Sequence, residues 1–241
     1  MGKILILDGQ QRNVLSCVRS LAKKGHVVDV GAHTKNALCF SSRFTAEKWL
    51  YPDPAEHPEA FLEALQNKVR ETRYDLVLPF IDSSTKIVVD AQDMLQQYVP
   101  LHVPRPESFH LAFDKAKTFQ LARKLNLPAP ETRYPKNLDD AVKLAGEIGY
   151  PVVIKPRKSS GSRGLKIVKN EQELVSAFPR IHAKYPEPIL QEYIPLQDAV
   201  GFVALYDNDG KLKAYSQHKR LHEFPLSGGP STLRITIDDK R

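Results

Sequence analysis

The sequence predicts an α/β protein in which a parallel sheet comes first and an α+β region follows. In the first hundred residues, apolar runs at 3–7, 27–30 and 76–80 alternate with helical periods at 13–24 and 58–73. Buried parallel strands and their crossover helices alternate in this way. After residue 150 the apolar runs are short and close together, with turn residues between them, which is typical of antiparallel hairpins.

Individual residues predict where the helices begin and end in the first half of the chain. Gly25 follows the last apolar residue of the first helix and is expected to end it. Ser83 and Ser84 follow the third strand and are expected to cap the next helix. Residues 37–51 show no period and are expected to be irregular. The elements expected here are strands at 3–7, 27–30, 76–80 and 101–103, and helices at 13–24, 58–73 and one opened by residues 81–84.

Two asparagines mark helix starts in the second half. Asn137 precedes a helical period that Gly149 ends. Residues 170–173 (Asn-Glu-Gln-Glu) resemble a capping box, in which the cap and the third helical residue both bind the backbone. The elements expected here are helices at 109–125, 138–148 and 171–178, and strands at 151–154, 165–168, 189–194, 200–206, 211–218 and 233–237.

A polar loop between two of these strands is the first functional candidate. Residues 159–164 (Ser-Ser-Gly-Ser-Arg-Gly) are small or basic, and the glycines admit positive φ, so backbone N–H groups can approach an anion closely. Lys155 ends the strand before the loop, where an ammonium can reach a phosphate. A hairpin with a solvated basic loop explains the same residues equally well, so the loop alone leaves both interpretations open.

Composition and residue spacing argue against several classes of function. The 241 residues carry a net charge of +7 that is spread along the chain, with no basic run interleaved with aromatics, so we expect no nucleic-acid interface. No run of about 18 apolar residues is present, so we expect no membrane span. Only Cys17 and Cys39 are cysteines, no Cys/His cluster has zinc-ligand spacing, and the N-terminus lacks the pattern of a signal peptide. We therefore expect a cytoplasmic protein.

The order of the charged residues resembles the ATP-grasp superfamily. Lys115 stands in an Asp-Lys pair on a helix, Lys155 ends a strand before the Gly/Ser/Arg loop, and residues 191–194 (Gln-Glu-Tyr-Ile) end another strand. The chain looks most like the carbamoyl-phosphate-synthase-like proteins, or carboxylate–amine ligases, of that superfamily. The resemblance implies a Rossmann-like pre-ATP-grasp domain at 1–105, an ATP-grasp N-terminal lobe at 106–190, and the start of a C-terminal lobe, incomplete, at 191–241.

The resemblance also implies roles for the nucleotide-binding candidates. Lys115 and Lys155 would contact the phosphates of ATP, with Lys117 as the alternative to Lys115. Backbone groups of residues 192–194 would meet the adenine edge, and Asp198 would bind the ribose. The full set of expected nucleotide-binding residues is Lys115, Lys155, Ser160, Gly161, Ser162, Gly164, Gln191, Glu192, Tyr193, Ile194 and Asp198.

Two further pairs of residues are candidates for contacts with substrates. Arg220 and Glu223 match a superfamily segment that faces the phosphates and the acceptor, and are the expected catalytic residues; a surface ion pair between them is the simpler alternative. Arg12 and Asp82 follow strands whose carboxyl ends form the ligand-binding edge of open α/β sheets. We therefore count both as candidate substrate contacts.

Magnesium or manganese is the expected metal, and its ligands are unknown. In the superfamily they follow the Gly-Gly turn, which stands here at residues 228–229, and the sequence reaches Arg241 before a matching segment. Asp238 and Asp239 do not match that segment. Three explanations stay open: the sequence is a shortened form of a longer protein, another polypeptide supplies the missing lobe, or the protein binds nucleotide without turning it over.

The expected function is an ATP-dependent carboxylate–amine (or carboxylate–thiol) ligase that acts through an acylphosphate. The alternative is a catalytically incomplete nucleotide-binding or regulatory subunit that needs a separate C-terminal lobe. A homo-oligomer or a partner chain is expected where the lost lobe leaves apolar surface exposed. A dinucleotide-dependent oxidoreductase is a third interpretation, which the absence of G-x-G-x-x-G after the first strand disfavours.

Overall fold

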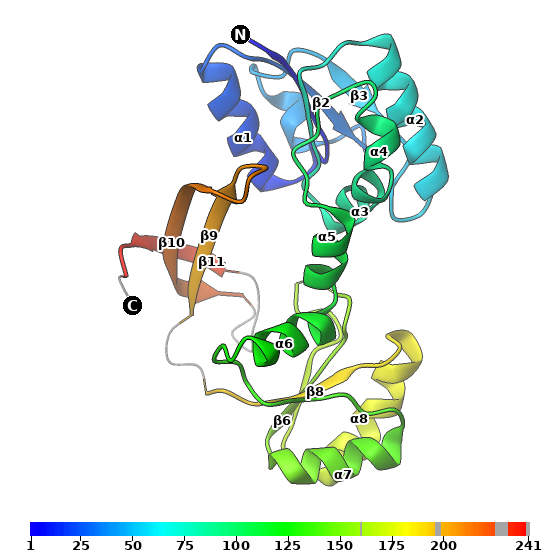
Figure 1. Ribbon diagram of the computed structural model, residues 1–241, viewed down its shortest axis with the longest axis vertical. Coiled ribbons are helices and arrows are strands. Elements are labelled where there is room, and N and C mark those ends of the chain that lie inside the picture. The colour runs from blue at the N-terminus through cyan, green and yellow to red at the C-terminus, as the bar shows by residue number, and fades with distance from the viewer. Residues whose placement is uncertain (160, 196–198, 225–230, 240–241) are drawn as a thin grey trace. The chain divides into compact units, whose positions relative to one another are not determined.

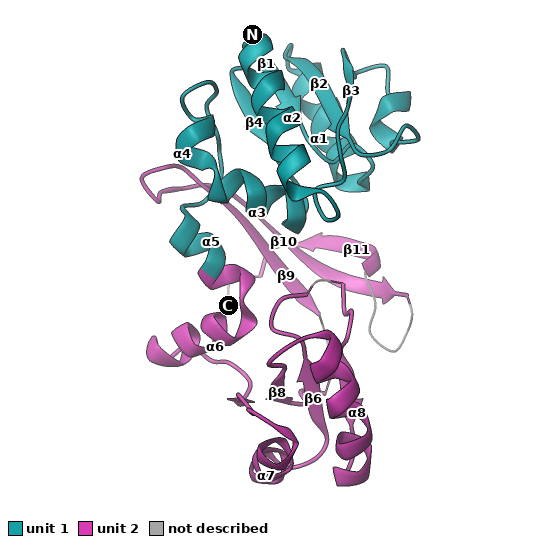
Figure 2. Ribbon diagram, turned by 90° about the vertical axis from the view of Figure 1, so that its right-hand side faces the viewer, with its two compact units in different colours: residues 1–110 teal, residues 111–241 magenta. Residues whose placement is uncertain are grey.

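The structure is a computed structural model that describes residues 1–159, 161–195, 199–224 and 231–239. The chain divides into two compact units, residues 1–110 and 111–241, and the boundary falls inside helix α5 (Pro106–Phe113) (Figure 2). The first unit contains a parallel sheet and the second contains antiparallel sheets, so the predicted α/β class is confirmed. The predicted domain boundaries at 105 and 190 stay predictions.

The first unit is built on a parallel four-stranded sheet of order β3-β2-β1-β4. Helix α1 lies on one side of this sheet and helix α2 on the other (Figure 1). The elements are β1 (Lys3–Ile6), α1 (Arg12–Lys23), β2 (Val27–Ala32), the 3₁₀ turn η1 (Leu38–Ser41), β3 (Lys48–Leu50), α2 (Pro58–Glu71), β4 (Leu76–Leu78), α3 (Asp82–Asp90) and α4 (Gln92–Leu95).

Alternation along β1 explains why this sheet is buried on both faces. Ile4 and Ile6 pack in the cluster that contains the apolar side of α1, whereas Leu5 and Leu7 pack in the cluster that contains the apolar side of α2. All four side chains are buried. A strand that is apolar at every position is therefore what two covered faces require.

Two short segments differ from the prediction for this unit. Residues 48–50, in the stretch expected to be irregular, form the edge strand β3, which pairs in parallel with β2. Three residues are too few to show a period. The strand expected at 101–103 is reduced to a single bridge between Val77 and Leu101.

Asp8, which follows β1, forms hydrogen bonds with the backbone that follows β4. Its buried carboxylate accepts hydrogen bonds from two backbone N–H groups after β4 (2.8 and 3.1 Å), from the Ser84 hydroxyl (2.6 Å) and from the Tyr51 hydroxyl (3.0 Å). The predicted capping of α3 by Ser83 and Ser84 is wrong: Ile81 is the N-cap residue. Ser84 lies inside the helix, and its hydroxyl donates to Asp8.

The second unit contains two antiparallel sheets, of order β5-β8-β6-β7 and β11-β10-β9. Helices α7 and α8 share a core with the four-stranded sheet. The elements are α6 (Lys115–Lys124), β5 (Thr132–Arg133), α7 (Leu138–Ile148), β6 (Val152–Lys155), β7 (Lys166–Val168), α8 (Glu171–Lys184), β8 (Ile189–Glu192), β9 (Val200–Tyr206), β10 (Leu212–Glu223) and β11 (Ser231–Ile237).

Both predicted asparagine caps are confirmed. The Asn137 side chain accepts from the N–H of Asp140, and the Asn170 side chain accepts from the N–H of Glu173, each at 2.9 Å. The Glu173 carboxylate accepts in return from the N–H of Lys169 (3.0 Å), one residue before the position that a capping box uses. These local signals fix the starts of α7 and α8.

The single helix predicted at 109–125 is wrong, because the segment forms two helices, α5 and α6. The break is at Asp114, which has an extended backbone (φ −98°, ψ 106°) and whose side chain accepts from the N–H of Ala116 (3.0 Å). Apolar residues continue across the break and hide it in the sequence. As a result Lys115 is the first residue of a helix rather than a residue in the middle of one.

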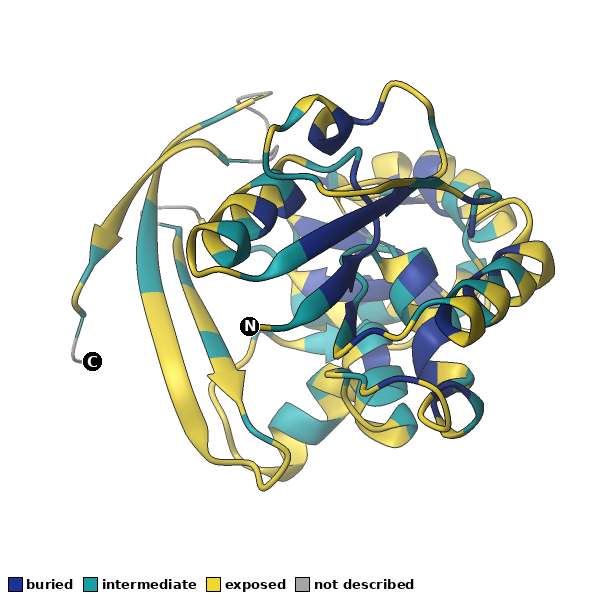
Figure 3. Cartoon of the chain, turned by 90° about the horizontal axis from the view of Figure 1, so that it is seen from above, coloured by how far each residue is buried: buried dark blue, intermediate teal, exposed yellow. Residues whose placement is uncertain are grey.

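The two sheets of the second unit differ in burial. Most residues of β6 and β8 are buried, whereas no described residue of β9, β10 or β11 is (Figure 3). Among the described helices, none is long and apolar enough to cross a membrane.

Candidate functional site

A hollow of about 420 Å³ in the second unit lies between α6 and the end of β6. Both candidate lysines, Lys115 and Lys155, line it, together with the loop between β6 and β7. Its size falls in the range of small-molecule sites, roughly 300–1,000 Å³. The complete lining is Ala112, Lys115, Thr118, Phe119, Lys155, Pro156, Ser159, Gly161, Ser162, Arg163 and Leu165.

Lys155 faces the hollow because it is the last residue of an alternating strand. Val152 and Ile154 pack in the core with α7 and α8, which places Lys155 on the opposite face of the sheet. Its ammonium donates a hydrogen bond to the side-chain oxygen of Gln191. Burial, followed by the nearby positive charge of Lys115, lowers the pKa of Lys155. An incoming anion would therefore stabilise its charged form.

Lys115 contacts the loop from the start of α6. Its N–H donates to the carbonyl oxygen of Arg157 (3.1 Å), and its ammonium donates to the carbonyl oxygen of Ser159 (2.5 Å). Lys117, the alternative phosphate contact, is exposed on the same helix and does not line the hollow. The geometry thus favours Lys115 of the two.

A partly buried ion pair, which the sequence did not suggest, joins α6 to the loop. The carboxylate of Asp114, only 2% exposed, accepts two hydrogen bonds from the Arg157 guanidinium, at 3.0 and 2.6 Å. Burial opposes the charge of Asp114, but the hydrogen bonds and positive charge of Arg157 outweigh it and hold the pKa of that carboxyl below its ordinary value. Since Asp114 precedes Lys115 and Arg157 follows Lys155 by two residues, the pair fixes both lysines relative to each other.

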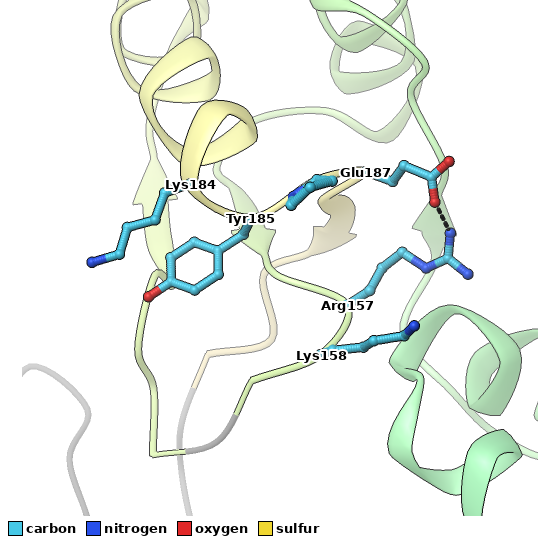
Figure 4. Close-up of a pocket in the computed structure, with 6 residues that line it drawn as sticks. Arg157, Lys158, Lys184, Tyr185 and Glu187 are labelled. Carbon is cyan, nitrogen blue, oxygen red and sulfur yellow. Dashed lines mark hydrogen bonds and ion pairs between the residues drawn. The ribbon is translucent and has the colours of Figure 1, made fainter. Parts of the chain in front are cut away.

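The outer side of Arg157 forms a second ion pair. Its guanidinium contacts the exposed carboxylate of Glu187, just after α8 (Figure 4). The residue therefore joins three segments: the start of α6, the start of the loop and the end of α8.

Gly164 fixes the far end of the loop. Its φ is +76°, and a Cβ at this position would lie 2.6 Å from the ring of Tyr185 and 2.7 Å from Pro156. Gly161 also has positive φ (64°), as the sequence predicts for this loop, and so does Ser162 (61°). The close approach at Gly164 shows why a side chain is excluded there.

The segment expected to meet the adenine makes other contacts in this structure. The Gln191 side chain is buried and, besides accepting from Lys155, donates to the Thr132 hydroxyl (2.9 Å). The N–H of Glu192 donates to the carbonyl oxygen of Glu131 (2.8 Å). Glu192 lines a second hollow, of about 390 Å³, which Phe119 also borders. Tyr193 is partly exposed and Ile194 is exposed, and their contacts with a nucleotide stay predictions.

Arg220 and Glu223, the expected catalytic residues, lie on β10 of the three-stranded sheet. Their side chains form an ion pair with a distance of 3.6 Å between Nη1 and Oε2. Arg12 and Asp82 are the first residues of α1 and α3. The roles predicted for these four residues stay predictions. Ser160, Asp198, Gly228 and Gly229 lie outside the described residues.

Within residues 1–159, 161–195, 199–224 and 231–239, no group of three or more His, Cys, Asp or Glu side chains could hold a metal ion. Magnesium prefers carboxylate and phosphate oxygens, and these residues gather no such carboxylate set. The metal ligands are therefore not identified among the described residues.

The segment that carries the hollow is similar in sequence to known proteins. Residues 114–187, which contain both lysines and the loop, match the family described as carbamoyl-phosphate synthase L chain, ATP binding domain. The carbamoyl phosphate synthase large chain of Xanthomonas campestris pv. campestris is 42% identical over 139 residues. That match covers 57% of this chain and 13% of the large chain.

Solved structures share the fold at low sequence identity. The biotin carboxylase domain of Hydrogenobacter thermophilus 2-oxoglutarate carboxylase, a dimer in complex with MgADP, ADP and bicarbonate, matches with a TM-score of 0.76 and 18% identity, over 91% of this chain and 50% of that one. The L-amino acid ligase of Bacillus licheniformis matches with a TM-score of 0.74 and 16% identity, over 97% of this chain and 55% of that one.

The match to an ATP-binding domain model and the shared fold confirm the predicted resemblance to the ATP-grasp superfamily. More particularly, the segment that carries the hollow is similar to the ATP-binding domain of carbamoyl-phosphate synthase. The chain spans 13% of the length of the Xanthomonas large chain and about half the length of the two solved structures. The reaction and substrates of those proteins are therefore proposals for this one.

Proposed function

We propose that this protein binds ATP in the hollow between α6 and β6 and uses it to join a carboxylate to an amine or a thiol. The observation that supports this most is the pair of lysines, Lys115 and Lys155, which face one hollow beside a loop with two positive-φ glycines. Two ammonium groups this close repel each other, and the lowered pKa of Lys155 reflects that repulsion as well as burial. The negative charge of a bound polyphosphate would offset both the repulsion between the ammonium groups and the cost of burying the charge of Lys155.

In the proposed reaction a carboxylate oxygen attacks the γ-phosphorus of ATP, and the bond to the β,γ-bridging oxygen breaks. ADP leaves, and the amine nitrogen then attacks the acyl carbon, loses a proton and expels phosphate. Lys115 and Lys155 hold phosphate oxygens and stabilise the charge that develops on the leaving oxygen. Bound Mg²⁺ or Mn²⁺ would neutralise further phosphate charge.

Each lysine already has a neutral oxygen partner that orients it toward the hollow. The ammonium of Lys115 contacts the carbonyl oxygen of Ser159, and that of Lys155 contacts Gln191. These oxygen contacts hold the two ammonium groups beside the hollow, and charges that are positioned before the reaction are what electrostatic catalysis uses. The Asp114–Arg157 pair keeps the two lysines together in the absence of nucleotide.

Calorimetric titration with ATP and magnesium tests the nucleotide site. We expect the parent chain to bind and Lys155→Ala to bind about tenfold or more weakly, because a hydrogen bond to a charged group contributes roughly 1.5–3 kcal/mol. Lys117→Ala removes a lysine from α6 outside the hollow and is the matched control, with affinity close to that of the parent. Equal affinity in parent and Lys155→Ala, with both folded by circular dichroism, would refute the site.

Turnover separates the two functions that remain open. ADP release that depends on a carboxylate and an amine supports the ligase. ATP binding without ADP release, measured across a panel of carboxylates and amines, supports the catalytically incomplete nucleotide-binding subunit.

A further inference from the structure

The hollow of about 390 Å³ in the second unit lies between the second half of α6 and the strands β5 and β8. Among the residues that the structure describes, the lining of this hollow and that of the proposed nucleotide hollow have only Phe119 in common. Its volume falls in the range of small-molecule sites, roughly 300–1,000 Å³. The superfamily resemblance implies a role at the adenine edge for the backbone of Glu192 and assigns none to its carboxylate. The hollow is therefore a separate candidate site.

Hydrogen bonds fix the walls of this hollow. After α6, Asn126 has positive φ (54°), and the N–H of Leu127 donates to the carbonyl oxygen of Ala122 (2.9 Å), so the chain leaves the helix through a closed turn. The hydroxyl of Tyr134, which follows β5, donates to the carbonyl oxygen of Ala116 in α6 (3.4 Å). The segments that bound the hollow are thus bonded to one another before a ligand arrives.

Two arginines and two glutamates line the hollow, and one arginine is already paired with one glutamate. The Arg133 guanidinium forms an ion pair with the Glu131 carboxylate, and its Nε lies 3.8 Å from Oε2 of Glu147. In the part of the chain that the structure describes, the Arg123 guanidinium makes no hydrogen bond or ion pair, and the Glu192 carboxylate contacts no cation. The hollow therefore offers one positive and one negative charge to a ligand.

The negative charge is held in place by the backbone of Glu131. Oε2 of Glu192 accepts a hydrogen bond from the N–H of Glu131 (3.1 Å), while the N–H of Glu192 donates to the carbonyl oxygen of Glu131 (2.8 Å). A backbone N–H is a neutral donor, so it orients the carboxylate and leaves its charge. The carboxylate of Glu192 is thus positioned to accept from an ammonium group.

The uncharged part of the lining is mainly apolar. Leu127 is 56% exposed and Tyr134 is 36% exposed, so both present surface that a ligand would remove from water. Small-molecule sites combine such surface with a few polar groups that fix the orientation of the ligand. The apolar lining residues are Phe119, Leu127, Ala129, Pro130 and Tyr134.

We propose that this hollow binds a small zwitterion, whose carboxylate contacts Arg123, whose ammonium contacts Glu192 and whose apolar part covers Phe119 and Leu127. A guanidinium matches the planar geometry of a carboxylate, and an ammonium has only donors, as a carboxylate requires. Amino acids are the small molecules with this chemistry. An α-amino acid carries its two charges on neighbouring atoms, and an ω-amino acid carries them at the two ends of its chain.

Calorimetric titration of the full chain at low salt with L-leucine and, separately, with 6-aminohexanoate tests the site. We expect the parent to bind at least one of them. Hexanoate lacks the ammonium and hexylamine lacks the carboxylate, so each is expected to bind roughly tenfold or more weakly than the zwitterion. Tighter binding of leucine identifies an α-amino acid as the ligand, and tighter binding of 6-aminohexanoate identifies an ω-amino acid.

Substitutions assign the two charges to their residues. Arg123→Gln and Glu192→Gln should each weaken the binding of the zwitterion roughly 10- to 100-fold. Glutamine at position 192 keeps a side-chain oxygen for the N–H of Glu131, so this variant removes the charge and retains the hydrogen bond. Lys124→Gln is the matched control: it removes a positive charge from the neighbouring residue of α6, which is exposed and does not line the hollow, and should bind like the parent.

Three results overturn the proposal. They are a parent, folded by circular dichroism, that binds neither zwitterion; Lys124→Gln weakening the binding as much as Arg123→Gln; and hexanoate or hexylamine binding as tightly as the zwitterion. The ATP titration is read separately. Zwitterion binding in a parent that binds no ATP keeps this site and removes the proposed function, and ATP binding that depends on Lys155 without zwitterion binding does the reverse.

Discussion

The two sheets of the second unit have similar apolar content and opposite surroundings. Val152, Ile154 and Leu190 of the four-stranded sheet are fully buried in the core with α7 and α8. Phe202 and Tyr215 of the three-stranded sheet are each more than half exposed. The first sheet is therefore stabilised by packing and the second mainly by strand pairing, so equal substitutions in the two are expected to have unequal effects.

The largest expected contrast is between two phenylalanines. Phe178 of α8 is 1% exposed in the core of the four-stranded sheet, whereas Phe202 of β9 is 56% exposed and stacks on Tyr215. Phe178→Ala should lower the free energy of unfolding by about 3–5 kcal/mol, and Phe202→Ala by about 1 kcal/mol or less. Urea unfolding followed by circular dichroism measures both. Equal losses would show that the three-stranded sheet is as tightly packed as its neighbour.

A second contrast uses the two carboxylates that contact Arg157. Asp114 is buried and Glu187 is exposed. Asp114→Ala removes the two charge-assisted hydrogen bonds from Arg157 and the N-cap of α6, so it should cost roughly 3 kcal/mol of unfolding free energy. Glu187→Ala should cost less than about 1 kcal/mol, as exposed pairs do. If both variants unfold at the same urea concentration, the Asp114–Arg157 pair does not hold α6 to the loop.

A smaller contrast concerns two glycines with nearly equal positive φ. Gly164 (76°) is crowded by Tyr185 and Pro156, whereas Gly210 (75°), in the turn between β9 and β10, has nothing near its missing Cβ. Alanine at either position should cost about 1–2 kcal/mol of backbone strain. Only Gly164→Ala should also weaken ATP binding, and Tyr185→Ala in the same chain should restore part of it. Unchanged ATP affinity in Gly164→Ala would show that the loop does not cover the nucleotide.

The smallest expected effect is on proton uptake. Burial and Lys115 place the pKa of Lys155 below its ordinary value of 10.5 in the free protein, and a bound polyphosphate raises it again. Nucleotide affinity should therefore fall as the pH rises through that lowered pKa, and binding there should take up protons. The unfolded chain binds more protons between the two pKa values, so stability without nucleotide should rise with pH across this window. Calorimetry in buffers of different ionisation heat measures the uptake, and its absence in the parent chain would remove Lys155 from the phosphate site.

The sequence predicts best what is decided locally. Strand β1 and the caps Asn137 and Asn170 follow from apolar runs and from side chains that bind the nearest backbone groups. Strands β3 and β5 have three and two residues, too few for a period, and their existence depends on the neighbours β2 and β8. The break at Asp114 was missed because apolar residues continue on both sides of it.

In the candidate site, too, the sequence predicts the features that have a local pattern and misses the contact that depends on the tertiary fold. Lys115, Lys155 and the glycine loop carry a recognisable order along the chain, so the sequence predicts them. Arg157 meets Asp114 across 43 residues, and no local pattern encodes a contact that only the tertiary fold brings about. Arg157 lies in the segment 155–157 (Lys-Pro-Arg), and Asp114 lies in the segment 114–115 (Asp-Lys). The sequence signal that could have indicated the pair is that each partner lies within two residues of a candidate lysine.

The Asp114–Arg157 pair also constrains how this sequence can evolve. Replacing Arg157 alone leaves the buried carboxylate of Asp114 without this partner, and replacing Asp114 alone removes the cap of α6 together with the two hydrogen bonds from Arg157. Replacing both with apolar residues of similar volume is often tolerated. Related proteins are therefore expected to change positions 114 and 157 together or not at all. Each position is within two residues of a lysine that lines the hollow. The two segments that carry these lysines are distant in the sequence, and we expect them to vary together among related proteins.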